Sequence, residues 1–409
     1  MKTVPVPRAL GLGSVFALAL ILSLQIVGTG QALATASSTG STPLASGCLL
    51  SNATAAEVAQ VHSSLVGTPG QTYGIAVTPN SQDVFVSTDN PATLQEYSLK
   101  TGIPTREGPN WWTESSVGSA LAGDEPSGLA FTSNRRHLVV ATGIGAAVFE
   151  VDSSGASQSA LRLVGTLASP GGQPLEIALS PDGRFVLLSD HESGELAVFD
   201  LQRALTVGFG PKDLIGTVAL GVLPGGMSFS PNGRYLYIVS EKQPTGQQVG
   251  SLTTLSVAAL EKQPSRAVVS TVDSGCGSVR VTATSSRVYV TARDADSLLS
   301  FSAKALVDDP SHALVGDLDV GAGPIGIAVV NHDRGLAVAD SLGGDGGDIV
   351  VLRIGRHGEP SLAGYVNSGQ YPREMATSPN GKWLFVGDWQ SDQLQSVQVK
   401  ALLATWPNF

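Results

Sequence analysis

Three charged side chains stand where a repeated pattern elsewhere in the chain has small residues. The pattern occurs seven times, and its opening position is Gly in four copies and Ser in one. Glu176 and Glu374 take that position in the third and seventh copies, and Arg280 replaces a small residue two positions further on in the fifth. Bulky charges at crowded positions need partners, because an unpaired buried charge is costly. These residues therefore either form ion pairs between repeats or bind a polar ligand.

Further polar residues fall in the loops that the repeats place beside these charges. They are Asp190, His191, Asp340, Arg373, Asp388 and Trp389. The predicted ligand-binding set comprises these six with Glu176, Arg280 and Glu374. For catalysis, a carboxylate or the histidine could activate water while an arginine stabilises an oxyanion. The catalytic candidates are Glu176, His191, Arg280, Arg373 and Glu374. The three aspartates have a second interpretation as turn caps.

The elements that position these residues follow from the repeat itself. Its copies begin at Gly74, Gly128, Glu176, Gly226, Ser278, Gly326 and Glu374. Successive copies start 48 to 54 residues apart, a period typical of propeller blades or solenoid units. Each copy carries four strand signals, which in the third copy cover residues 176–180, 184–189, 195–201 and 213–221. Asp182-Gly183 lies between the first two and is typical of a tight hairpin turn.

The sequence therefore predicts an all-β protein, a seven-bladed β-propeller of four-stranded antiparallel blades with almost no helix. The seventh copy ends after its third strand, at 392–399, whereas a segment near the start of the chain, 57–67, resembles the fourth strands elsewhere. We expect this N-terminal strand to pair with the C-terminal blade and close the ring, which removes two exposed sheet edges.

Strand direction predicts where a site would lie in such a ring. The start of each first strand and the loop after each second strand share one face, around the mouth of the central channel. Propellers usually bind their ligands on such a concave face. All the candidates above belong to this face.

The first 34 residues have the pattern of a secretory signal peptide. Lys2 and Arg8 give a basic start, residues 10–27 are apolar, and Ala32-Leu33-Ala34 is a small-residue cleavage site. An uncleaved membrane anchor is the alternative, because the apolar stretch approaches spanning length. The mature chain is expected to be exported, to the periplasm, the cell surface or the medium.

The rest of the chain is expected to form one folded domain with short extensions. Residues 35–56 are rich in Ser, Thr and Ala and predict a flexible lead-in. Residues 57–401 hold all seven repeats and predict a single propeller domain, and residues 402–409 form a C-terminal tail.

Composition agrees with an exported β protein. Charged residues make up 14% of the chain, below the usual quarter, while 48 Gly and 23 Pro supply turns for a chain of hairpins. The formal net charge is −10 at pH 7, and an acidic chain lacks the basic field that binds nucleic acid. The expected partner is a small polar ligand, a protein or a glycan, bound by a monomer.

Two features bear on covalent and metal stabilisation. Cys48 and Cys276 are the only cysteines, and an oxidising compartment would allow a disulfide between them, with two free thiols as the alternative. Asp340, Asp345 and Asp348 punctuate a Gly-rich loop that could hold Ca²⁺ or be a solvated hairpin loop. No other cofactor is predicted.

The turn and strand sequences resemble the YVTN β-propeller repeat family. Tyr289-Val290-Thr291 matches the tripeptide that names the family, and Ser-Pro-Asp-Gly or Ser-Pro-Asn-Gly recurs at positions 180, 230 and 378. The resemblance covers residues 57–401 and implies the propeller architecture. The wider group includes lactonase-like propellers, which show a His before a first strand and a Asp-Leu-Gly-x-Asp loop after the second. At those places this chain has Leu175-Glu176 and the loop 190–194, of which Asp190 matches.

Three functions are compatible with these observations. The first is an exported propeller that binds a ligand or protein through its channel mouth. The second is a lactonase-type hydrolase of cyclic esters that uses the catalytic candidates named above. The third is a purely structural propeller at the cell surface.

Overall fold

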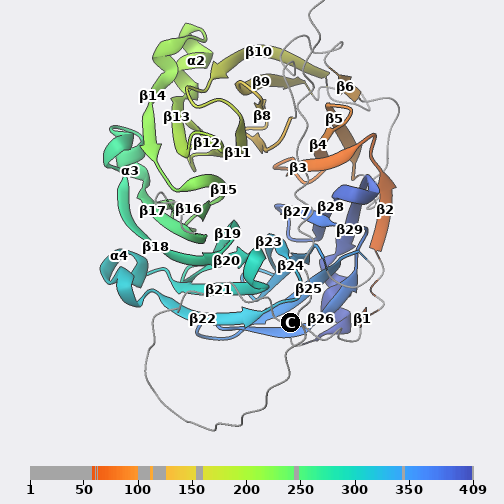
Figure 1. Ribbon diagram of the computed structural model, residues 1–409. Coiled ribbons are helices and arrows are strands. Elements are labelled where there is room, and N and C mark those ends of the chain that lie inside the picture. The colour runs from red at the N-terminus through yellow and green to blue at the C-terminus, as the bar shows by residue number, and fades with distance from the viewer. Residues whose placement is uncertain are drawn as a thin grey trace, which may run out of the picture. The chain divides into compact units, whose positions relative to one another are not determined.

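The computed structural model describes residues 58–59, 61, 63–99, 111–113, 126–152, 160–243, 248–342 and 346–407. These residues belong to one compact unit, Gly47–Phe409. Within it, seven sheets stand side by side around a common centre (Figure 1). Each first strand contacts the first strand of the next blade, so the first strands line the central channel. The predicted seven-bladed, all-β architecture with four-stranded antiparallel blades is confirmed.

Blades 1 to 3 are formed by twelve consecutive strands. Blade 1 contains β3 (Gln71–Val77), β4 (Asp83–Asp89), β5 (Thr93–Ser98) and β6 (Trp111–Thr113). Blade 2 contains β7 (Leu129–Phe131), β8 (His137–Thr142), β9 (Gly145–Asp152) and β10 (Ala160–Ala168). Blade 3 contains β11 (Pro174–Leu179), β12 (Phe185–Asp190), β13 (Glu195–Asp200) and β14 (Leu214–Ala219).

Blades 4 to 6 continue in the same order. Blade 4 contains β15 (Val222–Phe229), β16 (Tyr235–Lys242), β17 (Val249–Ser256) and β18 (Val268–Cys276). Blade 5 contains β19 (Ser278–Ala283), β20 (Arg287–Ala292), β21 (Ser297–Ser302) and β22 (Leu314–Asp319). Blade 6 contains β23 (Pro324–Val330), β24 (Gly335–Asp340), β25 (Asp348–Ile354) and β26 (Pro360–Asn367), and its edge is extended by the parallel strand β1 (Val58–Ala59).

Blade 7 is built from both ends of the described chain. Its first three strands are β27 (Pro372–Thr377), β28 (Trp383–Asp388) and β29 (Gln393–Gln398), and its fourth is β2 (Ser63–Gly67). Strand β2 runs antiparallel to β29, with Leu65 opposite Gln395. The predicted ring closure by an N-terminal strand is therefore confirmed.

The turn between the first and second strands explains why the repeats fold into hairpins. In blade 3 the Ser180 hydroxyl donates to Asp182, and the backbone N–H of Phe185 donates to the Ser180 hydroxyl at 2.9 Å. Gly183 takes the left-handed conformation, with φ of 72°, that closes this turn. Blades 4 and 7 repeat the arrangement with Ser230 and Ser378.

Short helices follow several third strands, and this differs from the expected near absence of helix. They are α2 (Leu201–Val207), α3 (Val257–Leu260), α4 (Ala305–Asp308) and α5 (Val399–Thr405). Single 3-10 turns are η2 (Pro211–Asp213), η3 (Pro264–Arg266), η4 (Arg293–Ala295), η5 (Pro310–His312) and η6 (Trp389–Ser391). Asp200 caps α2 by accepting from the N–H of Arg203 at 2.9 Å. The helices escape sequence analysis because they are too short for an apolar period of 3.6 residues to appear.

The hydrophobic core lies between neighbouring blades. One cluster joins Phe85 of blade 1 to Leu138 and Phe149 of blade 2, and another joins Tyr289 of blade 5 to Val338 of blade 6. Each blade thus buries both of its faces, which holds the ring together and fixes the position of its first strand. Among the residues described here, no helix is long and apolar enough to cross a membrane.

Candidate functional site

The pairing of first with second strands defines one equivalent position in every blade. Glu176 lies opposite Ser189, Glu374 opposite Gly387, and Arg280 opposite Thr291. Arg280 therefore stands level with the two glutamates in the ring, and the expected offset of two residues is wrong.

The offset arose because the blade 5 turn is shorter than the others. In blade 3 the N–H of Ser180 donates to the carbonyl of Phe185, five residues on, whereas in blade 5 the N–H of Thr284 donates to the carbonyl of Arg287, three residues on. When the repeat sequences are aligned on their second strands without gaps, the first strand of blade 5 is therefore displaced by two residues relative to the first strands of the other blades.

The same level of the ring is occupied by glycine in the other four blades. They are Gly74, Gly128, Gly226 and Gly326. A Cβ on Gly226 would lie 2.8 Å from Cα and 3.0 Å from Cδ of Arg280. Gly226 is thus required because Arg280 of the next blade lies close to its backbone. The four glycines together leave the space that the three charged side chains fill.

The three charged residues meet as an ion triad that links blades 3, 5 and 7. Nη2 of Arg280 lies 2.6 Å from Oε1 of Glu176 and 2.8 Å from Oε2 of Glu374, and its Nε donates to the same Oε2 at 3.1 Å. The side chains are 8%, 18% and 17% exposed for Arg280, Glu176 and Glu374. Burial raises the pKa of Glu176, which Arg280 lowers and the charge of Glu374 raises further.

Arg373 occupies the ring one residue before Glu374 and has a different environment. Its guanidinium carbon lies 4.2 Å from the ring centroid of Tyr73 in blade 1, a cation–π contact. In the described part of the chain, its side chain has no ion pair and no hydrogen bond. The half-buried Arg373 thus presents a positive charge at the mouth that forms no ion pair with a described carboxylate, although it lies close enough to Glu176 to help lower the pKa of that carboxyl.

His191 lies in the loop after β12, where the positive charges of Arg373 and Arg280 affect its pKa. Burial lowers the pKa of His191, with Glu241 opposing and the two arginines adding to the shift. The imidazole is therefore neutral at pH 7 and can both donate and accept a hydrogen bond.

Sequence analysis missed a second ion pair on the same face. Arg293 binds Glu241, with Nη2 3.0 Å from Oε2, and Asp294 also contacts Arg293. Glu241, near the end of β16, and Arg293, just after β20, are equivalent to His191 in the register of their blades. Reading that one position through all seven repeats would have found both.

The three aspartates at the ends of second strands do not face the channel with free carboxylates. Ser169 donates to Asp190 at 2.5 Å and Ser368 to Asp388 at 2.7 Å, and both aspartates are fully buried. Burial raises the pKa of Asp190 to about 6 and that of Asp388 to about 7. Asp340, also buried, lies against Gly321 in the corresponding place. The structure thus places them behind the loops that enter the first strands.

The remaining predicted residues are placed only in part. The ring of Trp389 lies 5.5 Å from that of Tyr371 beside the mouth. Asp340 and Asp348 face each other across β24 and β25, while Asp345 lies outside the described residues. Among the residues that the structure describes, no group of three His, Cys, Asp or Glu is suited to hold a metal ion.

The structure describes one of the two cysteines that were predicted to form a disulfide. Cys276, at the end of β18, is buried and disulfide-bonded. Cys48 lies outside the described residues. Its pairing with Cys276 therefore stays a prediction.

The fold and the mouth define a seven-bladed propeller with charged residues around its channel. The family model described as "Lactonase, 7-bladed beta-propeller" matches residues 113–208 and 318–403 of this chain. Together with the seven-bladed structure, this match confirms the predicted resemblance to lactonase-like propellers. No curated protein matches the chain by sequence.

Solved structures share the fold at low sequence identity. The chain is similar to hydrazine synthase of Kuenenia stuttgartiensis, with 15% identity and a TM-score of 0.61 over 81% of this chain and 96% of that one. It is similar to the Cps50 (Swd1) β-propeller domain of Myceliophteria thermophila, with 10% identity and a TM-score of 0.58 over 82% and 99%. It is also similar to a chain of the mitotic checkpoint complex, with 11% identity and a TM-score of 0.59 over 86% and 98%. These likenesses show the fold alone.

Proposed function

We propose that this propeller is a binding module whose channel mouth takes a small anionic ligand. The observation that carries the proposal is Arg373, a cation held on the face of Tyr73 and left without a carboxylate partner among the described residues. A guanidinium in this state binds a carboxylate or phosphate group through two parallel hydrogen bonds.

The neighbouring groups suit such a ligand. Arg280 is already paired with both glutamates of the triad, so Arg373 is the guanidinium that remains for a ligand. His191 is neutral and offers a donor and an acceptor, and Trp389 offers an aromatic surface beside the mouth. The site thus combines a cation without an ion-pair partner among the described residues, one polar group and an apolar surface, the usual make-up of a small-molecule site.

The test is a calorimetric titration of the full chain with succinate and with inorganic phosphate. We expect saturable binding of at least one anion, and a loss of about tenfold or more in affinity for Arg373→Gln, since a charge-assisted pair contributes roughly 1.5–3 kcal/mol. Arg135→Gln is the matched control, because Arg135 is exposed on the opposite face. Binding that survives Arg373→Gln unchanged would remove the mouth from consideration.

The family match favours a second candidate, hydrolysis of cyclic esters. A carboxylate of Glu176 or Glu374, or the neutral His191, would activate water, and Arg373 would stabilise the oxyanion that forms on the lactone carbonyl. A lactone panel, assayed with and without EDTA, tests this candidate. Turnover that is lost in a Glu176→Ala, Glu374→Ala double variant, while thermal unfolding shows that the variant is still folded, would place catalysis at the mouth.

The compartment also belongs to the proposal. Support comes from the basic, apolar and small-residue pattern of the first 34 residues. Mass spectrometry of the protein from its native cells checks this: an N-terminus at Thr35 indicates cleavage and export, whereas an intact N-terminus would contradict cleavage.

A further inference from the structure

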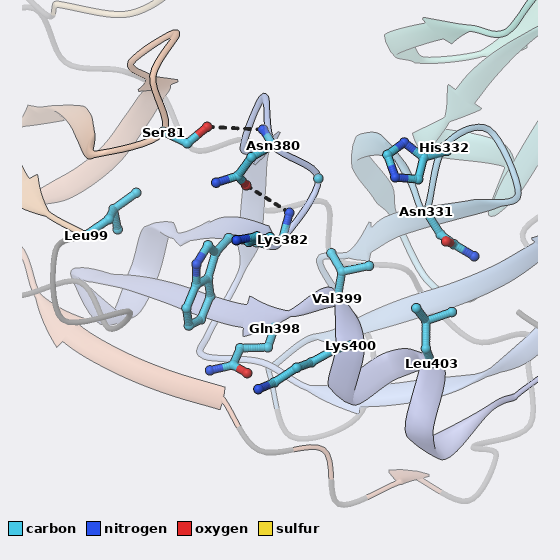
Figure 2. Close-up of a pocket in the computed structure, with 12 residues that line it drawn as sticks. Ser81, Leu99, Asn331, His332, Asn380, Lys382, Gln398, Val399, Lys400 and Leu403 are labelled. Atoms are coloured by element: carbon cyan, nitrogen blue, oxygen red, sulfur yellow. Dashed lines mark hydrogen bonds between the residues drawn. The ribbon is translucent and has the colours of Figure 1, made fainter.

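A groove of about 690 Å³ lies on the face opposite the channel mouth, because it is lined by turns at the ends of first strands that point away from the mouth. Figure 2 shows its lining residues. Its walls are the first hairpin turns of blades 1, 6 and 7 together with helix α5. The backbone N–H of Asn380 donates to the hydroxyl of Ser81 at 3.1 Å, which joins blades 7 and 1 across the closure of the ring. The groove is therefore formed only when the ring is closed, and its volume suits a small ligand.

The groove combines three kinds of side chain. Trp383, Val399 and Leu403 give it an apolar surface, Asn331, Asn380 and Gln398 give it amide groups, and Lys382 and Lys400 are cationic. Figure 2 shows Gln398 and Lys400 directed to the same side of the groove. Within the described part of the chain, neither lysine has an ion pair. Two unneutralised ammonium groups in one groove stand out on a chain with a formal charge of −10.

A second groove between blades 4 and 5 provides an internal comparison. It has about 480 Å³, lies between the equivalent turns and α4, and contains Lys304. Lys304 and Lys400 are equivalent, because each is the second residue after a third strand. Lys304 is paired with Asp308 one helical turn later, whereas Lys400 has Ala404 there. The lysine charge is thus neutralised by an ion pair in the second groove. In the groove beside α5 the equivalent lysine has no ion pair with a described residue.

The blade 6 turn adds an independent observation. Asn331, His332 and Asp333 take left-handed conformations in succession, with φ of 53°, 51° and 65°. In blades 3, 4 and 7 the equivalent turn needs one such residue, and it is glycine. Non-glycine residues rarely take the left-handed conformation in succession. Such strained residues occur most often at binding and active sites. Here it brings Asn331 and His332 to the groove, with the imidazole of His332 against Gly381.

We propose that this groove binds an acidic saccharide, a sugar ring that carries a carboxylate. The indole of Trp383 would pack on the C–H face of the ring, and Lys382 and Lys400 would bind the carboxylate. The amide of Gln398 and the Nδ2 group of Asn380, whose Oδ1 already accepts from Ser378 and Lys382, would form hydrogen bonds with hydroxyl groups. The site is separate from the channel mouth, so this inference does not depend on the function proposed there.

The test is a titration of the full chain with trigalacturonate, beside the neutral sugar maltotriose, by isothermal calorimetry at low salt. We expect saturable binding of trigalacturonate that weakens as salt is added. Lys382→Gln with Lys400→Gln should lower the affinity by about 2- to 30-fold, because two exposed charge contacts are lost together. Lys304→Gln is the matched control in the second groove and should change nothing, and thermal unfolding checks that both variants fold.

Three results would overturn the proposal. Absence of saturable trigalacturonate binding removes the ligand class. An equal affinity for maltotriose removes the role of the carboxylate. An equal loss in the Lys304→Gln control means that the anion binds through the general field of surface lysines. Arg373→Gln should leave this binding intact, so failure here and failure at the mouth are distinguishable.

Discussion

Arg280 is one cation paired with two carboxylates. The stability of a variant therefore depends on which of these three charges is removed. Removing Arg280 would leave Glu176 and Glu374 close together with no cation between them. Removing both carboxylates would leave one buried cation alone. Removing all three charges leaves nothing unpaired, and a buried ion pair often contributes little compared with apolar groups of similar size.

We therefore expect Arg280→Met to lower the free energy of unfolding by about 3–5 kcal/mol. The triple variant Glu176→Gln, Arg280→Met, Glu374→Gln should recover most of that loss. Urea denaturation followed by fluorescence measures both, with the exposed Arg135→Gln as a control. A triple variant as unstable as the single one would show that the ion pairs themselves stabilise the ring.

The buried carboxyl of Asp388 makes stability depend on pH. Burial raises its pKa to about 7 in the folded protein, whereas in the unfolded chain the pKa returns to about 3.9. Between these values the folded state binds more protons than the unfolded state, so this group lowers stability as pH rises from about 4 to about 7.

Asp388→Asn removes this titration while keeping an oxygen that can accept from Ser368. We expect the variant to gain stability over the wild type as pH rises through that window, by at most a few times 1.4 kcal/mol, since each pKa unit is worth about that much. Urea midpoints at pH 4.5, 6 and 7.5 measure the difference. Parallel pH profiles for the two proteins would contradict the raised pKa.

At this scale the sequence predicted the residue types of the candidate site better than their geometry. Glu176, Glu374 and Arg280 were identified as charges at inner positions, and the structure brings them into contact. The predicted position of Arg280 along its strand was wrong, because the blade 5 turn is two residues shorter than the others. A comparison of the repeats without gaps does not detect such a shortening. The partner of Arg373 could not be predicted at all, since Tyr73 is 300 residues away in the chain.

The strand β2 has five residues and completes the last blade of the ring. It covers β29, which would otherwise be an exposed sheet edge in the last blade. Val66 packs against the cluster that contains Val84 and Phe385, whereas Leu65 points outward and is 53% exposed. The backbone N–H of Thr68 donates to Asp392 of the blade, so the N–H of Val66, two residues earlier, faces the same side.

Val66→Pro should therefore remove a ladder hydrogen bond and core packing together. We expect a loss of about 3 kcal/mol or more in the free energy of unfolding, with a tendency to aggregate through the uncovered edge. Leu65→Ser, on the outward face of the same strand, should stay within roughly 0.5 kcal/mol of the wild type. Thermal unfolding and light scattering measure both effects, and similar losses in the two variants would refute the inward assignment of Val66.

The elements also show where sequence analysis stops being informative. Tight turns with Asp182-Gly183 chemistry located the hairpins because their residue types are specific to that geometry. The groove beside α5 gave no such signal, since its walls come from three turns and a short helix that meet only when the ring closes. Its two lysines are ordinary surface residues in the sequence, and they are distinguished only by having no ion pair with any residue that the structure describes.

At the scale of the whole molecule, closure depends on β2 lying beside β29, and the position of β2 in the chain should not matter. Ser63 lies opposite Val397, so the start of β2 is next to the end of β29, from which α5 continues. A short linker after α5 could therefore lead directly into β2. Such a chain would hold all four strands of blade 7 in sequence, as the other blades do.

A circular permutant that begins at Gly70 and carries residues 48–69, and so keeps Cys48, behind a glycine-serine linker after Phe409 tests this. We expect it to fold as a soluble monomer that unfolds cooperatively, within about 2 kcal/mol of the full chain, because the contacts of the ring are kept and surface linkers cost little entropy. The same permutant without residues 58–69 should aggregate, since its last blade ends in an uncovered strand. Size-exclusion chromatography and urea denaturation compare the two. Equal folding of both would mean that three strands suffice to complete blade 7, and that β2 does not close the ring.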